Sequence, residues 1–143
     1  MPARADFKPA AAARFLHNII LLEAPVGDGK SLKVRVAGQL FQGVVAHPVG
    51  GTDYLDILPA RYHPGALASV RLMVATPCGL WQLMPVHLKG ISRTVEFTAF
   101  PLAPGNDGIP LILGFLFPLD GLTLAPPLAG KEISVDTAIE FLF

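Results

Sequence analysis

Glycine and proline divide this chain into short apolar segments, and that division limits the folds it can adopt. The 143 residues include 14 glycines and 14 prolines, together about a fifth of the chain. The apolar segments between them recur at intervals of about 8–15 residues, a spacing typical of strands in a sandwich or barrel. We therefore predict an all-β fold, a single-domain β-sandwich or barrel of about eight strands.

The strands are expected where apolar residues alternate with polar ones or form short runs. They lie at about residues 15–24, 31–46, 54–58, 68–76, 80–88, 91–100, 109–117 and 132–143. The clearest is the sixth, where Val95, Phe97 and Ala99 alternate with polar residues and should face the core. The seventh is almost wholly apolar, as in a strand buried on both faces. Pro85 predicts an edge position or a bend in the fifth.

Residues 1–13 are predicted to form an extended N-terminal arm, and residues 14–143 the β domain. The arm is mildly basic and has no apolar periodicity. A short helix within residues 9–23 is an alternative, because Pro9 suits a first helical position, but we favour a strand at 15–24. An arm without its own core becomes ordered only through contacts with another surface, so we expect it to contact a neighbouring copy.

A polar insert at residues 26–31 separates two apolar runs. Residues 24–31 read Ala-Pro-Val-Gly-Asp-Gly-Lys-Ser, a relaxed form of a phosphate-loop pattern. With the apolar lead-in before it, this segment resembles the first motif of helicase-type P-loop ATPases. The resemblance implies that backbone N–H groups hold phosphates, Lys30 contacts the β- and γ-phosphates, and the Ser31 hydroxyl binds Mg²⁺. It makes a nucleotide-binding fragment one alternative function.

The same insert also fits a turn between two strands. Ala24 stands where the strict phosphate-loop pattern has glycine, and we find no second acidic motif after an apolar strand. Leu32, Val34 and Val36 alternate with polar residues, which predicts a strand where a phosphate loop must open a helix. The Gly-Asp-Gly at residues 27–29 tolerates positive φ angles. We therefore interpret the insert as a turn and predict no cofactor.

Charge and hydropathy exclude several classes of partner. The 11 basic and 11 acidic residues cancel, so no electrostatic feature points to nucleic acid or an anionic membrane. No apolar run approaches the ~20 residues of a membrane-spanning helix. Charged residues are only 15% of the chain, and hydrophobic residues are 52%. Such a chain has a large core for its size or covers apolar surface with a partner.

Two features bear on the compartment without identifying it. Cys78 is the only cysteine, which excludes an internal disulfide or a cysteine-based zinc site and fits the cytoplasm or a virion. Near the start, the alanine run at residues 10–13 is too short for a secretory signal, and Arg14 interrupts it. We expect no signal peptide, and the localisation stays unknown.

Residues 47–66 hold most of the polar candidates for a site. His47, Asp53, Asp56 and His63 could form a metal or acid–base site only if three or four of them converged. They lack a known ligand spacing, so we interpret them as turn formers and solvated side chains. No serine lies in a nucleophile-elbow motif. We therefore predict no catalytic residue, no metal and no enzyme activity.

Arg61, Tyr62 and His63 offer N–H donors and a stacking surface. They would suit a ligand carboxylate or sugar, but Tyr and Arg are also enriched at protein interfaces. We assign these three residues, with Phe7 and Trp81, to an interface. The predicted function is a structural subunit that self-assembles into a homo-oligomer such as a fibre, tube, shell or virion component. The alternative is a β-barrel that binds a small apolar ligand, lined by Trp81 and phenylalanines.

Overall fold

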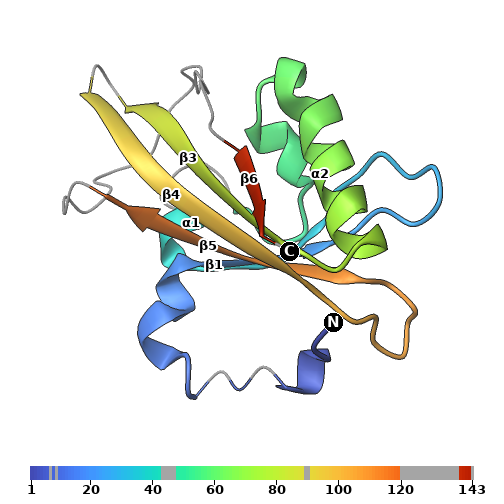
Figure 1. The fold of residues 1–143 in the computed structure, drawn as a ribbon. Helices are drawn as coiled ribbons and strands as arrows, with labels where there is room; N and C mark the ends of the chain where they lie inside the picture. Colours follow the sequence, from blue (N-terminus) through green and yellow to red (C-terminus); the bar gives the residue numbers. More distant parts are fainter. Residues whose placement is uncertain (7, 9, 43–47, 89–90, 120–138, 143) are drawn as a thin grey trace.

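The computed structural model describes residues 1–6, 8, 10–42, 48–88, 91–119 and 139–142, which form one antiparallel sheet with helices on both sides (Figure 1). The strands are β1 (Ile19–Glu23), β2 (Val34–Ala37), β3 (Gly79–Leu88), β4 (Ile91–Leu102), β5 (Leu111–Pro118) and β6 (Ile139–Leu142). Their order is β2-β1-β5-β4-β3-β6, and each neighbouring pair is antiparallel. Because β2 and β6 are separate edges, the sheet in the described residues is open.

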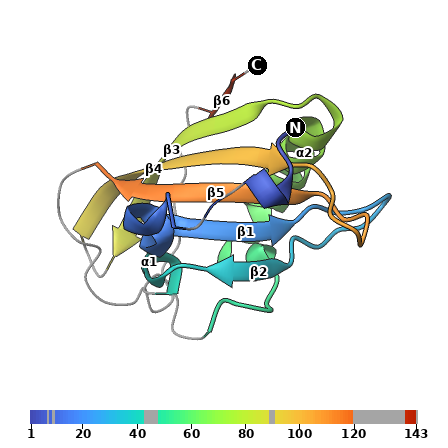
Figure 2. The same cartoon turned by 90° about the horizontal axis from the view of Figure 1, so that it is seen from below.

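Most helices lie between β2 and β3 in the sequence. The helices are η1 (Arg4–Asp6), η2 (Ala13–Asn18), α1 (Gln39–Gln42), η3 (Tyr54–Ile57), η4 (Ala60–Tyr62) and α2 (His63–Ala75), where η marks 3₁₀ geometry. Helix α2 lies across one face of the sheet, and the N-terminal segment lies on the other (Figures 1 and 2). In the part of the chain with described structure, no helix has the length and apolar character needed to cross a membrane.

The mostly-β class is confirmed, but the architecture differs from the expected one. The described residues form one open sheet covered by a helix, rather than an eight-stranded sandwich or barrel. Two segments account for the difference, because residues 54–58 and 68–76 were expected to be strands. The first forms η3 and the second lies largely within α2. The apolar face of the sheet is therefore buried by a helix instead of by a second sheet.

The sequence of α2 combines helical signals with an alternation that misled the strand prediction. Val70, Leu72 and Val74 have the period of a strand, but Leu72 is 38% exposed, whereas Val70 and Met73, three residues apart, are buried. That spacing is helical. Pro64 lies in the first turn, where its fixed φ and missing N–H suit a helix start. The segment is also rich in Ala, Leu and Met, which favour helix.

The insert after β1 forms a turn, as predicted. Gly29 donates its backbone N–H to the Val26 carbonyl at 3.1 Å, and Gly27 has a φ of 59°. An extended segment and β2 follow, so the helix that a phosphate loop must open is not present there. The expected strand at 31–46 was too long, because β2 ends at Ala37 and α1 follows. Its last residues, 43–46, lie outside the described residues.

The N-terminal segment contacts the chain's own sheet. The Pro2 carbonyl accepts a 2.8 Å hydrogen bond from the Ala103 N–H, and Ala3 forms a parallel bridge with Ala103. The expected strand at 15–24 and the alternative of a short helix within 9–23 were each partly right. Helix η2 covers residues 13–18 and leads directly into β1 at residue 19. At their junction Asn18 is 5% exposed, and its Nδ2 donates to the Leu116 carbonyl at 2.7 Å. That bond fixes the end of η2 to β5.

The main core lies between the sheet and the helical segments. Val95, Phe97 and Ala99 are all buried there, which confirms the predicted alternation of β4. Strand β5 contributes to both faces, as its apolar sequence predicted. Its residue Ile112 lies in the main core, while Leu113 belongs to a smaller cluster on the opposite face. The smaller cluster consists of Ile19, Leu102, Leu111 and Leu113.

Pro85 lies within β3 without ending it. It pairs with Thr94 of β4, whereas β6 pairs only with residues 79–82 of β3. At Pro85 the second edge of β3 therefore has no partner strand among the described residues. A proline has no N–H to offer a strand there, so this edge position agrees with the prediction.

Candidate functional site

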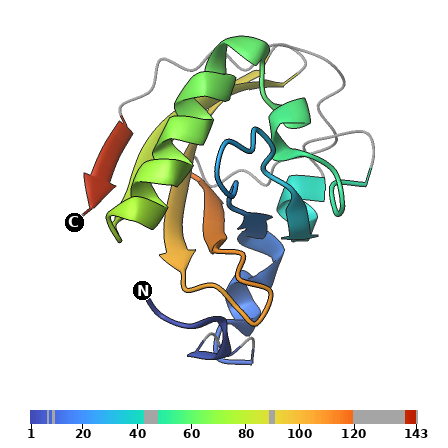
Figure 3. The ribbon, with the colours of Figure 1, turned by 90° about the vertical axis from the view of Figure 1, so that its right-hand side faces the viewer.

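A pocket lies between α2 and the inner face of the sheet, and its cavity has a volume of about 160 Å³. Figure 3 shows α2 alongside the sheet, with the shorter helical turns that precede it near its first turn. Four strands, three helices and their flanking segments contribute side chains. The lining residues are Leu22, Leu32, Tyr54, Leu58, Arg61, Tyr62, Gly65, Ala66, Ser69, Val70, Met73, Leu80, Gln82, Phe97, Ala99 and Ile112.

The floor of the pocket is the apolar inner face of the sheet. Phe97 of β4 lies opposite Gln82 of β3, and both line the pocket. Gly114 of β5 lies beneath the Phe97 ring, and a Cβ at this glycine would be 2.8 Å from that ring and 2.9 Å from Ile20. The glycine therefore allows Phe97 to pack closely against β5. Leu22 and Ile112, both at most 2% exposed, complete the floor.

The α2 wall combines small and large residues in a helical pattern. Gly65, Ala66, Ser69, Val70 and Met73 have spacings of three and four, so they share one face of the helix. The three small residues occupy the first half of this face, where a Cβ at Gly65 would meet no atom within 4 Å. The larger Val70 and Met73 are buried in the second half. The cavity exists partly because the side chains in the first half of this helix face are small.

The wall that contains η3 is held by Asp53. Its Oδ1 accepts hydrogen bonds from the Leu32 and Leu55 N–H groups, each at 3.0 Å. The Tyr54 N–H donates to the Leu32 carbonyl at 2.8 Å, which places both lining residues beside each other. Burial acts to raise the pKa of Asp53, but the hydrogen bonds from Leu55, Ser31 and Leu32 outweigh it and hold that pKa below its usual value.

Polar groups in the pocket wall are few. Burial raises the pKa of Tyr54 to about 12, so its phenol is protonated and can donate at neutral pH. The Arg61 guanidinium carbon lies 4.8 Å from the centroid of the Tyr62 ring, a cation–π contact. Ser69 and Gln82 add a hydroxyl and an amide. The site can therefore enclose an apolar group and orient a polar one.

The structure brings together only part of the predicted interface. Arg61 and Tyr62 line the pocket. His63 Nε2 lies 2.9 Å from the Leu58 carbonyl, which ties the start of α2 to the segment before it. Trp81 does not line this pocket. Successive residues of a strand face opposite ways, and its neighbour Gln82 faces the pocket. Phe7 lies outside the described residues.

The loop at residues 47–66 does not assemble a metal site in its described part. Asp53 is occupied by backbone N–H groups, and His63 by a backbone carbonyl. Asp56 is exposed, and His47 lies outside the described residues. Across the described ranges, no group of three or more His, Cys, Asp or Glu residues could hold a metal ion.

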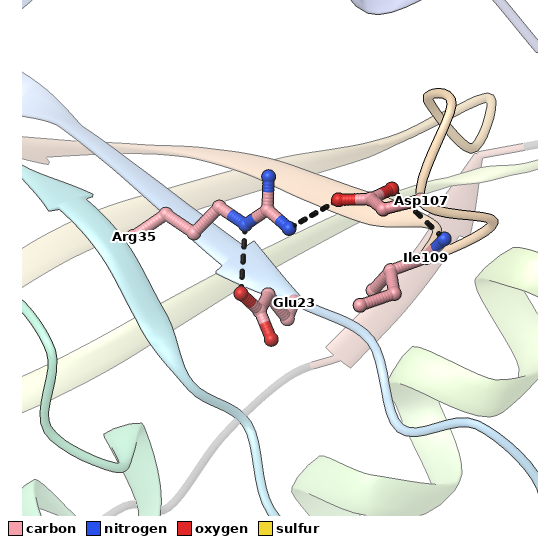
Figure 4. A network of polar contacts seen from close by, with 4 residues as sticks. All are labelled: Glu23, Arg35, Asp107 and Ile109. Atoms are coloured by element: carbon pink, nitrogen blue, oxygen red, sulfur yellow. Dashed lines mark hydrogen bonds and ion pairs between the residues drawn. The ribbon is translucent and has the colours of Figure 1, made fainter.

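A separate polar network joins the β4–β5 loop to β1 and β2 (Figure 4). Arg35 Nε lies 2.7 Å from Glu23 Oε1, and one terminal nitrogen lies 2.6 Å from Asp107 Oδ2. Asp107 Oδ1 also accepts from the Ile109 N–H at 3.1 Å. The bond to Asp107 and then that to Glu23 raise the pKa of Arg35, and the bond from Arg35 lowers the pKa of Asp107. Every member has a partner, so the network is structural.

Ser69, Val70 and Met73 were missed because they lie in the segment 68–76, which was expected to be a strand, and Gly65 lies in the polar segment before it. Gly65, Ser69 and Met73 recur every four residues, a signal that would have grouped them had the helix been recognised from Pro64. Gln82 and Phe97 become neighbours only through strand pairing.

A scan against protein-family models and a search of curated proteins each found no match for this chain. The pocket is therefore the main basis for a functional proposal.

Proposed function

We propose that this protein is a non-enzymatic binding protein that holds a small apolar molecule between α2 and the sheet. The supporting observation is the cavity of about 160 Å³, whose wall is mostly apolar. Concave apolar sites with a few placed polar groups are where proteins bind small molecules. A cavity of about 150 Å³ can hold benzene, so the ligand has one ring or a short branched chain inside the cavity.

The test is to fill the pocket without removing any core side chain. Gly65 lines the pocket and has open space at its Cβ position, so a Gly65→Phe variant should occupy the cavity and keep the fold. Ala68→Phe is the matched control, because Ala68 is an exposed residue of α2 outside the pocket. Toluene should raise the melting temperature of the parent and the control, and not that of Gly65→Phe. Equal shifts in all three would reject the pocket as the binding site.

Self-association is a second candidate function, favoured by the outer face of the sheet. Val36, Leu21, Leu113 and Phe100 lie opposite one another across β2, β1, β5 and β4, so they form one apolar row. Val36 is 45% exposed and Phe100 is 40% exposed at the two ends of this row. Leu113 in the middle of the row is buried, so the exposed apolar surface lies at the two ends, and exposed apolar surface is a common site of protein association. This row would serve a homo-oligomeric structural subunit.

Light scattering in dilute buffer tests the second candidate. The parent should be larger than a monomer, and Phe100→Lys should be smaller, because a charge at a buried interface is costly. Val26→Lys is the control, since Val26 is 65% exposed in the turn after β1. A chain that begins at Arg14 should keep its β spectrum and assemble more weakly if residues 1–13 also contact a neighbour. A monomeric parent would reject self-association.

A further inference from the structure

We infer that the ligand of this pocket is a small carboxylic acid, with its apolar body in the cavity and its carboxylate at Arg61. This assignment rests on the ligand-binding function proposed above and adds the chemical class of the ligand. The arrangement that supports it is a buried apolar floor with one cationic side chain in the wall. Such a site matches a molecule that is apolar at one end and anionic at the other.

The sign of the charge in the pocket wall is the first observation. Among the described residues that line the pocket, Arg61 is the only one with a charged side chain, and none is Asp or Glu. The remaining polar side chains are neutral: Tyr54, Tyr62, Ser69 and Gln82. The described lining therefore includes one cationic side chain and no carboxylate that would repel an anionic group.

The distribution of exposure along the pocket gives the orientation of the ligand. Arg61 is exposed, whereas Leu32, Met73 and Ile112 of the wall and floor are at most 1% exposed. A charged group is costly to bury without a partner, so the anionic end should remain at Arg61 near solvent. The apolar end gains most from the buried floor. The ligand thus enters with its ring or branched chain first.

The chemistry of arginine favours a carboxylate over a neutral polar group. A guanidinium has five N–H donors in a planar fork, so it can bind a carboxylate alongside the contacts it already makes. Its bidentate geometry matches the two oxygens of a carboxylate. The cation–π contact with Tyr62, at 4.8 Å, also orients Arg61. The cavity of about 160 Å³ limits the enclosed part to about the size of one benzene ring.

Comparing the binding of phenylacetate with that of phenylacetamide separates the effect of the ligand's charge from the effect of its shape. The two molecules share a ring and a linker and differ in whether the polar end is anionic. Calorimetry at neutral pH would measure both with the parent and with Arg61→Gln. Arg14→Gln is the matched control, because Arg14 makes the same kind of contact, 4.7 Å from the Phe15 ring, on a different element. Circular dichroism checks that each variant is folded.

The parent and Arg14→Gln should bind phenylacetate more tightly than phenylacetamide, and Arg61→Gln should bind the acid about tenfold more weakly or worse. Phenylacetamide should bind the parent and Arg61→Gln with similar affinity. If the acid binds Arg61→Gln as well as the parent, or the amide binds the parent as tightly as the acid, the carboxylate assignment is wrong while the pocket function stands. If neither molecule binds the folded parent, both proposals are wrong.

Discussion

The Oδ1 atom of Asp53 lies 3.0 Å from the backbone nitrogen of Leu32, and this bond joins the segment before β2 to the start of η3. The same oxygen accepts from the Leu55 N–H and so caps η3. Leu32 is fully buried and lines the pocket, as does Tyr54 next to Asp53. One carboxylate therefore fixes two parts of the pocket wall that are far apart in the sequence.

Asp53→Ala should destabilise the protein by about 1–2 kcal/mol. The substitution removes a helix cap and leaves the Leu32 N–H, in a buried residue, without its acceptor. Urea unfolding at neutral pH measures the change. Asp28→Ala is the control, because Asp28 is exposed in the turn after β1 and should change the free energy of unfolding by less than about 0.5 kcal/mol. Equal effects of the two substitutions would contradict the role given to Asp53.

The pH dependence of stability should also report on Asp53. Its hydrogen bonds hold the folded-state pKa below the unfolded value of about 3.9. A depressed folded-state pKa means that the contribution is complete above that unfolded value and is lost as the pH falls through the folded pKa. The free energy of unfolding of Asp53→Asn should therefore fall less steeply than that of the parent between about pH 5 and pH 2. Parallel curves would show that Asp53 has no depressed pKa.

Gly38→Ala should be strongly destabilising. A Cβ at Gly38 would lie 2.4 Å from the Leu16 carbonyl oxygen and 2.5 Å from that of His17. These are backbone atoms, so relief requires η2 to move away from the end of β2, at a cost of about 1–3 kcal/mol or more. Gly50→Ala is the control, because a Cβ there meets no atom within 4 Å. Similar melting temperatures for the two variants would contradict this close approach.

Val95→Asp should abolish stable folding or cost about 3 kcal/mol or more, because an unpaired carboxylate would enter the core. Val95 has 0% exposure. Its neighbour Thr94 is exposed on the opposite face of β4, so Thr94→Asp adds the same charge without burying it. Thermal unfolding should separate the two variants clearly. If Thr94→Asp were the more damaging substitution, the two faces of β4 would be assigned the wrong way round.

The sequence was sufficient to predict the strands with the strongest local patterns. The alternation of Val95, Phe97 and Ala99 and the apolar run of β5 each follow from burial of one or both faces of a strand. The turn at residues 26–29 was predictable because glycine there meets a requirement for positive φ at Gly27. These features depend on neighbours in the sequence alone.

The helix α2 and the pocket could not be obtained in the same way. Short apolar segments fit both helical and strand periods, and the alternation of Val70, Leu72 and Val74 concealed the burial of Met73. The pocket joins Leu22 of β1 to Ile112 of β5, residues that meet because β5 lies between β1 and β4. Strand order depends on long-range packing, which periodicity in one segment does not contain.

Methyl NMR of Met73 would test the central claim, that the pocket binds a small apolar ligand, most directly. The chain has three methionines, so ¹³C-methyl labelling gives few signals, and a Met73→Leu variant assigns the one from the pocket. On titration with toluene, the Met73 signal should shift and saturate, while the signal of the exposed Met1 should not. The Met73 shift should disappear in Gly65→Phe. A Met73 signal that stays unchanged in the folded parent at saturating toluene would contradict the proposed ligand-binding function.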